Sequence, residues 1–334
     1  MATIIQFNET GGTEVLKFVE QEVPAPAPGE VQVEVKAAGL NRAELGFFQG
    51  TYLVQPNLPG SLLGFEGAGI IRDIGEGVTG WSVGDKVAVT PAFEQNKYGM
   101  LGEVANVTAS SLEPIPEGVS FNEAAAFWMA FPTAYGLLVN KGGFRPGAGQ
   151  TAVLNAASSS VGTSAFQLVK AFGGVSIALT RGPSKVDRLK AAGADHVIVT
   201  SEEDTVSRIL EITNGEGATT ICDAVGGSDQ AALCNAAAFE GVVTQYGGLS
   251  GEMASTPLEA MFGKGVSLSA FHVIWHLFNV PERRRAAVEH LVAGQRDGVY
   301  SPLIDRTFAF GQTREAYEYM AANDQFGKIV VELA

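Results

Sequence analysis

The sequence TAVLNAASSSVG, residues 151–162, joins a short apolar run to a loop of small residues and then to the start of a helix. Small residues let the backbone come close to a pyrophosphate, whose negative charge then lies at the N-terminus of the helix. The strict fingerprint of such a loop has three glycines, and its positions hold Ala157, Ser159 and Gly162 here. Taken alone, the loop is equally typical of an ordinary helix that a serine caps after a strand.

The segment around this loop alternates short apolar runs with amphipathic stretches. After the loop, Val161, Ala165, Leu168 and Val169 mark one face of a helix. This alternation predicts an α/β fold in which a doubly wound parallel sheet, with helices on both faces, binds a dinucleotide. The predicted strands are 151–154, 175–179, 196–199, 219–222, 241–245 and 266–270, and further helices are predicted at 184–192, 204–213 and 228–238.

The flanking segments have a different character. Residues 31–35, Val-Gln-Val-Glu-Val, alternate apolar and polar side chains as a half-buried strand does. A helix is predicted with Asn122 as its N-cap, and a helix at 282–295 precedes a strand, a helix and a closing strand. We therefore predict a mostly β domain built from residues 1–125 and 275–334, and a dinucleotide-binding domain of residues 126–274.

The composition excludes several classes of protein. The chain has 334 residues, 46% of them hydrophobic, which is too many for an intrinsically disordered chain. Its formal net charge of −14 argues against a nucleic-acid partner, and its cysteines, Cys222 and Cys234, supply neither a disulfide framework nor a four-thiolate metal site. Because the sequence has no signal peptide and no apolar run of membrane-spanning length, we predict a cytoplasmic protein without a membrane partner.

The end of the second predicted strand indicates which dinucleotide binds. An NAD site has an acidic residue there for the ribose hydroxyls, whereas this chain has Thr180, Arg181, Ser184 and Lys185. The two cations and the two hydroxyls suit the 2′-phosphate of NADP. The alternative is that Arg181 and Lys185 are solvated loop charges.

Short motifs follow one another in a specific order: PGEV (28–31), GLNRAE (39–44), GTY (50–52), GFEGAG (64–69), GDKV (84–87), PTAY (132–135), the loop 151–162, GAD (193–195), DAVGG (223–227) and GKIV (327–330). Over essentially the whole chain, this order resembles that of the medium-chain dehydrogenase/reductase superfamily. The specific resemblance is to its zinc-independent NADPH:quinone oxidoreductase branch, the zeta-crystallin type. It implies a Rossmann nucleotide-binding domain and a mostly β, GroES-like catalytic domain.

The resemblance also argues against zinc. The zinc-dependent alcohol dehydrogenases of the superfamily bind catalytic zinc through Cys, His and Cys. The matching positions here are Asn41, Phe65 and about Met129, none of which is a usable ligand. His272 and His276 have a helical spacing that can bind metal, but no nearby carboxylate or cysteine supplies a third ligand. We therefore expect no metal site.

The resemblance implies that NADP(H) lies along the cleft between the domains. Its hydride would pass directly to a quinone or to the β-carbon of an α,β-unsaturated carbonyl, a small-molecule substrate. Asn41 would lie near the nicotinamide carboxamide or the acceptor, Thr133 near the nicotinamide ribose or phosphate, and Lys328 near the active cleft. The predicted cofactor contacts are Asn41, Thr133, Ala157, Ser158, Ser159, Ser160, Val161, Gly162, Thr180, Arg181, Lys185, Val225, Tyr246, Gly247, Gly248, Phe271, His272, Val273 and Lys328.

Tyr52 and Asn41 are the predicted catalytic residues. Tyr52 stands in the Gly-Thr-Tyr motif, where related enoyl-thioester reductases carry a tyrosine that supplies or relays a proton. A phenol can hydrogen-bond a carbonyl oxygen as negative charge develops on it. The alternative is that Tyr52 is an aromatic wall of the cleft, because a reduced quinone can take its proton from water.

Two other functions fit the sequence. One is an enoyl-thioester reductase, for which a basic groove for the carrier phosphate is not evident, and the other is a non-catalytic protein that binds NADPH. The resemblance further implies a homodimer or a tetramer, paired through the edge of the nucleotide-domain sheet. The predicted strand at 266–270 is the candidate for that edge.

Overall fold

The computed structural model describes residues 1–333, and the chain forms two compact units. The first unit contains residues 1–129 and the segment from residue 301 onward, and the second contains residues 130–300. The domain limits inferred from the sequence, after residues 125 and 274, stay a prediction.

The second unit is built around a parallel sheet with the strand order β11-β10-β9-β12-β13-β14. The strands are β9 (Thr151–Leu154), β10 (Val175–Thr180), β11 (His196–Val199), β12 (Ala218–Asp223), β13 (Ala237–Gln245) and β14 (Ser267–Ala270). Every neighbouring pair is parallel, and the order reverses between β9 and β12, which confirms the doubly wound fold. Val153, Ile177, Ile198, Ile221 and Val243 are fully buried, as expected for strands covered on both faces.

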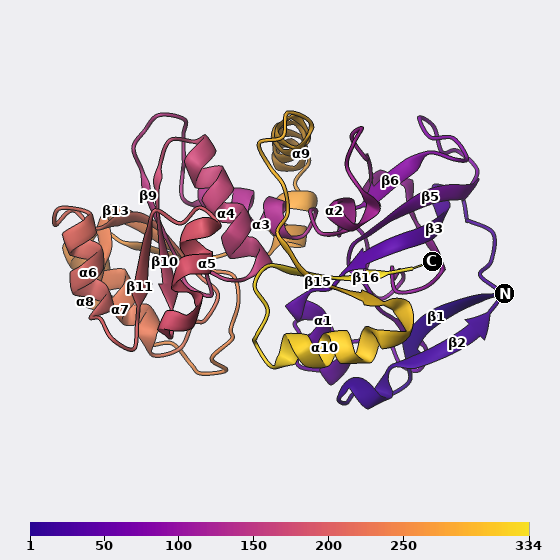
Figure 1. The fold of residues 1–334 in the computed structure, drawn as a ribbon, viewed down its shortest axis with the longest axis horizontal. Coiled ribbons are helices and arrows are strands. Elements are labelled where there is room, and N and C mark those ends of the chain that lie inside the picture. Colours follow the sequence, from indigo (N-terminus) through magenta and orange to yellow (C-terminus); the bar gives the residue numbers. More distant parts are fainter. Residues whose placement is uncertain (334) are drawn as a thin grey trace. The chain divides into compact units, whose positions relative to one another are not determined.

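Helices cover both faces of this sheet (Figure 1). Helices α4 (Ser160–Ala171) and α5 (Val186–Ala191) lie on one face, and α6 (Thr205–Ile212), α7 (Asp229–Asn235) and α8 (Leu258–Lys264) pack side by side on the other. Ile209, Leu233 and Ala260 of the second set are buried in the core that the strands form. The remaining elements are α3 (Ala130–Tyr135), the π-helical turns η3 (Gly136–Lys141) and η5 (Ile274–Phe278), the 3-10 turn η4 (Pro183–Lys185) and α9 (Pro281–Arg296).

The first unit is mostly β, and apart from one pair its strands are antiparallel, as predicted. Its larger sheet has the order β15-β16-β3-β5-β6-β8, with β7 also paired to β3, and its smaller sheet has the order β2-β1-β4. The strands are β1 (Ala2–Phe7), β2 (Lys17–Gln21), β3 (Glu30–Gly39), β4 (Ser61–Leu62), β5 (Gly67–Ile74), β6 (Lys86–Val89), β7 (Val104–Thr108), β8 (Leu112–Pro114), β15 (Ile304–Ala309) and β16 (Lys328–Glu332). Val31, Val33 and Val35 of β3 are buried, which confirms the alternation read from the sequence.

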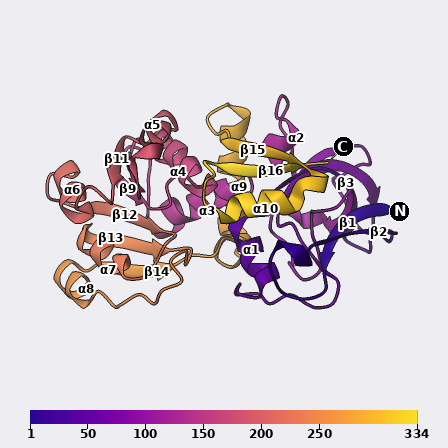
Figure 2. The same ribbon diagram turned by 60° about the horizontal axis from the view of Figure 1, so that its bottom comes forward.

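The C-terminal strands complete the larger sheet (Figure 2). Strand β16 pairs antiparallel with β3, so that Val330 lies opposite Gly39, and β15 pairs parallel with β16. Helix α10 (Thr313–Ala321) connects these two strands and packs beside α1 (Arg42–Gln49). The chain end is therefore joined to strands about three hundred residues earlier in the sequence.

The helix expected from Asn122 begins two residues earlier. In α2 (Phe121–Ala125) the N-cap is Ser120, whose hydroxyl accepts a hydrogen bond from the Glu123 N–H at 3.2 Å. Glu123 in turn accepts from the Ser120 N–H at 2.8 Å, which completes a capping box. The assignment of Asn122 as the cap was therefore wrong, because the reciprocal pair satisfies two backbone donors at Ser120.

Two features bear on partners. Of the helices within residues 1–333, none combines the length and the apolar character needed to cross a membrane. Strand β14 lies at one edge of its sheet and exposes Leu268. Pairing of two copies through this edge stays a prediction.

Candidate active site

One glycine and one serine shape the loop between β9 and α4. Ser159 is the N-cap of α4, and its hydroxyl accepts a hydrogen bond from the Gly162 N–H at 3.1 Å. A Cβ atom on Gly162 would lie 2.3 Å from the Ala157 carbonyl oxygen, so only glycine fits there. Ala156 has a φ of 46°, a left-handed conformation that turns the chain out of the strand. The loop is thus a tight turn at a helix N-terminus, the geometry that binds a pyrophosphate.

The neighbouring loop after β13 also fits a dinucleotide. The hydroxyl of Tyr246 is buried beside Ser159, and among the described residues it has no hydrogen-bond partner of normal geometry. Burial raises the pKa of Tyr246, which therefore stays a neutral donor. A Cβ atom on Gly247 would lie 2.5 Å from the Ala224 carbonyl oxygen, whereas the space beside Gly248 is open. An unused buried donor and an open backbone surface are what a bound nucleotide requires.

The predicted 2′-phosphate residues follow β10. Lys185 Nζ donates to the Ser158 hydroxyl at 3.2 Å, which places this cation directly against the phosphate loop. Arg181 and Ser184 are exposed in the same connection, and the Thr180 hydroxyl donates to the Gly182 carbonyl at 3.2 Å. The structure therefore brings Lys185 to the loop and leaves Arg181 at the surface beside it.

Other predicted contacts lie elsewhere in the second unit. Thr133 is buried in α3, and Val225 follows β12. Phe271, His272 and Val273 follow β14, where the His272 ring stacks on Trp275 with ring centroids 4.3 Å apart.

The two histidines once considered as a metal pair are otherwise engaged. His276 Nδ1 accepts a hydrogen bond from the His272 N–H at 2.9 Å. Burial lowers the pKa of His272 to about 4. Within residues 1–333, no group of three or more His, Cys, Asp or Glu side chains is arranged to bind a metal.

A buried ion pair organises the polar cluster of the first unit. Lys328, the first residue of β16, pairs with Glu66, and their side chains are 1% and 0% exposed. Lys328 Nζ also donates to Asn41 Oδ1 at 2.6 Å, and Asn41 Nδ2 donates to Glu66 Oε1 at 3.2 Å. A Cβ atom on Gly39 would lie 2.8 Å from Lys328 Cε, so the glycine leaves room for the lysine. The contacts fix the orientation of the Asn41 amide.

Glu44 anchors the start of α1 directly after Asn41. Its Oε2 accepts from the Asn41 N–H at 2.9 Å and from the Tyr317 hydroxyl at 2.7 Å, and its Oε1 accepts from the Phe65 N–H at 2.7 Å. Burial raises the pKa of the Glu44 carboxyl to about 7, although these donors oppose the shift. Glu44 therefore has a structural role and titrates near neutral pH.

The positions that match zinc ligands in related dehydrogenases are occupied by this cluster. The Asn41 side chain joins the ion pair, the Phe65 N–H donates to Glu44, and the Met129 N–H donates to Glu66 Oε2 at 2.7 Å. Phe65 and Met129 thus contribute backbone donors to two carboxylates. An amide, an ammonium and two carboxylates hold these three positions together.

Tyr52 lies in the first unit, after α1. Its ring packs on Phe65 with centroids 6.2 Å apart, and its hydroxyl lies against the Gln95 side chain. Burial raises the pKa of Tyr52, so the hydroxyl stays protonated and can donate at neutral pH.

Sequence reasoning missed several members of these clusters. Glu66 and Asp223 lie in motifs that were recognised, but their burial was not inferred. Tyr317 has no local signal. Asn155 precedes the phosphate loop and contacts Asp223.

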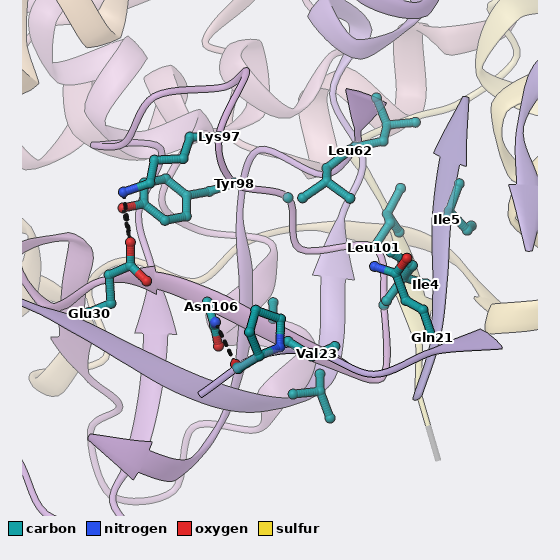
Figure 3. Close-up of a pocket in the computed structure, with 16 residues that line it drawn as sticks. Ile4, Ile5, Gln21, Val23, Glu30, Leu62, Lys97, Tyr98, Leu101 and Asn106 are labelled. Atoms are coloured by element: carbon teal, nitrogen blue, oxygen red, sulfur yellow. Dashed lines mark hydrogen bonds and ion pairs between the residues drawn. The ribbon is translucent and has the colours of Figure 1, made fainter. Parts of the chain in front are cut away.

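A hollow of about 240 Å³ lies elsewhere in the first unit, away from every predicted site residue (Figure 3). It is lined by Ile4, Leu62 and Leu101 and, at one end, by Glu30, which accepts hydrogen bonds from Lys97 at 2.7 Å and Tyr98 at 2.8 Å. All three polar groups are satisfied by one another, so the hollow carries no argument about catalysis.

Comparisons with known proteins cover both units. The alcohol dehydrogenase GroES-like domain matches residues 27–117, and the zinc-binding dehydrogenase family matches residues 160–291. A quinone oxidoreductase of Pseudomonas aeruginosa is 30% identical over 331 residues, 99% of each chain. The structure of an NAD-dependent alcohol dehydrogenase has a TM-score of 0.90 at 27% identity, covering 100% of both chains. That of Escherichia coli quinone oxidoreductase complexed with NADPH has a TM-score of 0.88 at 28% identity, covering 99% of this chain and 100% of the other.

The raised pKa of Glu44 predicts a pH-dependent stability. Between the unfolded value of 4.5 and about 7, the folded protein binds more protons than the unfolded chain, so its free energy of unfolding falls as pH rises. The full effect is about 3 kcal/mol. We expect E44Q to abolish this decline, measured by urea unfolding of both proteins from pH 4 to pH 9.

The matched control is E123Q, which changes the glutamate at the same position of the capping box of α2. Its unfolding free energy should follow the pH profile of the wild type. A profile of E44Q that also parallels the wild type would show that Glu44 does not titrate in this range.

Proposed function

Because the chain belongs to the quinone oxidoreductase branch of the medium-chain dehydrogenase/reductase superfamily, we propose that it transfers a hydride from NADPH directly to a quinone or an α,β-unsaturated carbonyl, without a metal ion. The observation that carries the proposal is the phosphate loop of α4 with Lys185 against it. An oxidoreductase is what the family supports, and cofactor choice, acceptor and metal independence are our inference from the residues.

The choice of NADPH rests on charge at the end of β10. An NAD site places a carboxylate there, where it would repel a 2′-phosphate. This chain has Arg181 and Lys185 instead, and Lys185 is already held at the loop by Ser158. Guanidinium and ammonium groups form strong, charge-assisted hydrogen bonds with phosphate oxygens. The Escherichia coli relative complexed with NADPH agrees with this choice, whereas the NAD-dependent neighbour is its rival.

Metal independence rests on the chemistry of three positions. Catalytic zinc requires imidazole, thiolate or carboxylate ligands, and Asn41, Phe65 and Met129 offer none of these. The carboxylate nearest to Asn41, Glu66, is already bound by Lys328. A positive charge is thus present where a metal would be, but as an ammonium.

The bound cofactor supplies the hydride, and the residues of the chain orient the reactants and manage one proton. The Asn41 carboxamide, held by Lys328, hydrogen-bonds the nicotinamide amide or the acceptor carbonyl. The Tyr52 hydroxyl donates to the acceptor oxygen as negative charge develops on it. The proton that completes the hydroquinone or the saturated carbonyl compound comes from this hydroxyl or from water.

Removing the two cations tests the cofactor assignment. Each charge-assisted hydrogen bond contributes about 1.5–3 kcal/mol, so R181A/K185A should raise the Kd for NADPH by about 100-fold and leave that for NADH within about 2-fold. Titration of cofactor fluorescence measures both constants. The control R188A/K190A removes two cations from α5 and should change neither constant. An unchanged ratio of the two constants in R181A/K185A would refute the assignment.

Tyr52→Phe tests the proton donor. Since a general acid contributes about 100-fold or more, kcat with an α,β-unsaturated ketone should fall by about that factor while the Kd for NADPH stays constant. Tyr319→Phe is the control, because its hydroxyl donates to Asp305, an unrelated carboxylate. Stopped-flow measurement of NADPH absorbance gives kcat, and an undiminished value would reduce Tyr52 to an aromatic wall.

A further inference from the structure

Asn155 and Asp223 meet where the strand order of the parallel sheet reverses. Asn155 is the first residue after β9, and Asp223 is the last residue of β12, the neighbouring strand. Asn155 Nδ2 donates to Asp223 Oδ1 at 2.5 Å, and the two residues are 9% and 0% exposed. Ligands of doubly wound sheets bind outside the carboxyl ends of the strands at this reversal. The pair therefore lies at the base of the proposed nucleotide site.

Each partner also holds backbone of the loop after β12. Asn155 Oδ1 accepts from the Ala224 N–H at 2.7 Å. Asp223 Oδ1 accepts from the Val225 N–H at 2.9 Å and from the Gly226 N–H at 2.8 Å. One carboxylate oxygen thus collects three amide donors, all of them neutral. Such donors stabilise a buried carboxylate and restrict the loop that supplies them.

The same network reaches the loop after β13. Asp223 Oδ2 accepts from Gln230 Nε2 at 3.2 Å, and this nitrogen also donates to Gln245 Oε1 at 3.0 Å. Gln245 Nε2 donates in turn to the Gly247 carbonyl oxygen at 3.0 Å. The loops that follow β9, β12 and β13 are therefore joined by side chains that do not themselves line the predicted cofactor contacts.

These three loops carry most of the contacts proposed for the dinucleotide. Ordering a flexible backbone costs about 1–2 kcal/mol per residue, and a binding site that is ordered in advance avoids this cost when the ligand binds. A loop released from its anchor would recover its freedom and lose it again on binding. The affinity for the nucleotide is then expected to depend on residues that never touch it.

We propose that Asn155 and Asp223 are positioning residues that hold the pyrophosphate loop and the loops after β12 and β13 in their nucleotide-binding conformation. This inference rests on the proposed function, because it assigns a dinucleotide to these loops. It adds residues that determine affinity from beneath the site through hydrogen bonds to backbone.

Exchanging the two side chains tests the pair. N155D places two carboxylates at hydrogen-bond distance and removes the donor, so the Kd for NADPH should rise by about 10-fold or more. N155D/D223N restores an amide facing a carboxylate with the roles exchanged, and should return the Kd to within about 3-fold of the wild type. D195N is the control: Asp195 accepts from the Ser176 N–H at 2.8 Å and from its hydroxyl at 2.7 Å near the start of β10. It should leave the Kd unchanged.

Hydrogen exchange in the protein without added nucleotide gives a second readout. The amides of residues 224–226 should exchange about 10-fold faster in N155D, because their acceptors are disturbed, and should return to the wild-type rate in N155D/D223N. The Gly162 amide, bonded to Ser159, serves as the internal reference. If the wild type binds neither NADPH nor NADH, the proposed function fails, whereas the exchange rates still report on the pair. Unchanged exchange in N155D, or no recovery of both readouts in the double variant, would overturn the inference.

Discussion

The ion pair between Lys328 and Glu66 is the constraint on which the first unit depends. Neither side chain has contact with solvent, and removal of one partner from such a pair costs about 3–5 kcal/mol because the other charge is left buried. The pair joins the last strand to the start of β5, and it fixes the side chain of Asn41 between them. A mostly β unit assembled from both ends of the chain is thereby given one defined arrangement at its polar centre.

In the second unit the corresponding constraint is topological. A parallel sheet whose strand order reverses has loops that diverge at the carboxyl ends of two neighbouring strands. Divergent loops need anchors, and Asn155 and Asp223 supply them with amide donors and a buried carboxylate. The two units use different chemistry for the same purpose, because an ammonium neutralises Glu66 whereas neutral amides surround Asp223.

Much of the fold was predictable from local patterns. The apolar runs of the parallel strands exceed any other signal, since these strands are covered on both faces, and the six predicted strands are all present. The phosphate loop was recognisable although Gly162 alone keeps the fingerprint. The pairing of Glu66 with Lys328 was not predictable, because 262 positions separate them and neither has a periodic signal. The error at Asn122 was avoidable, since Ser120 and Glu123 spell a capping box.

The central claim is a hydride transfer from NADPH that needs no metal. The most direct measurement is oxidation of NADPH and of NADH by chelator-treated, metal-free protein with a small para-quinone, followed by loss of cofactor absorbance. The account predicts rapid oxidation of NADPH and much slower oxidation of NADH. Equal rates with the two cofactors, activity that appears only when zinc is restored, or tight NADPH binding without turnover would contradict it.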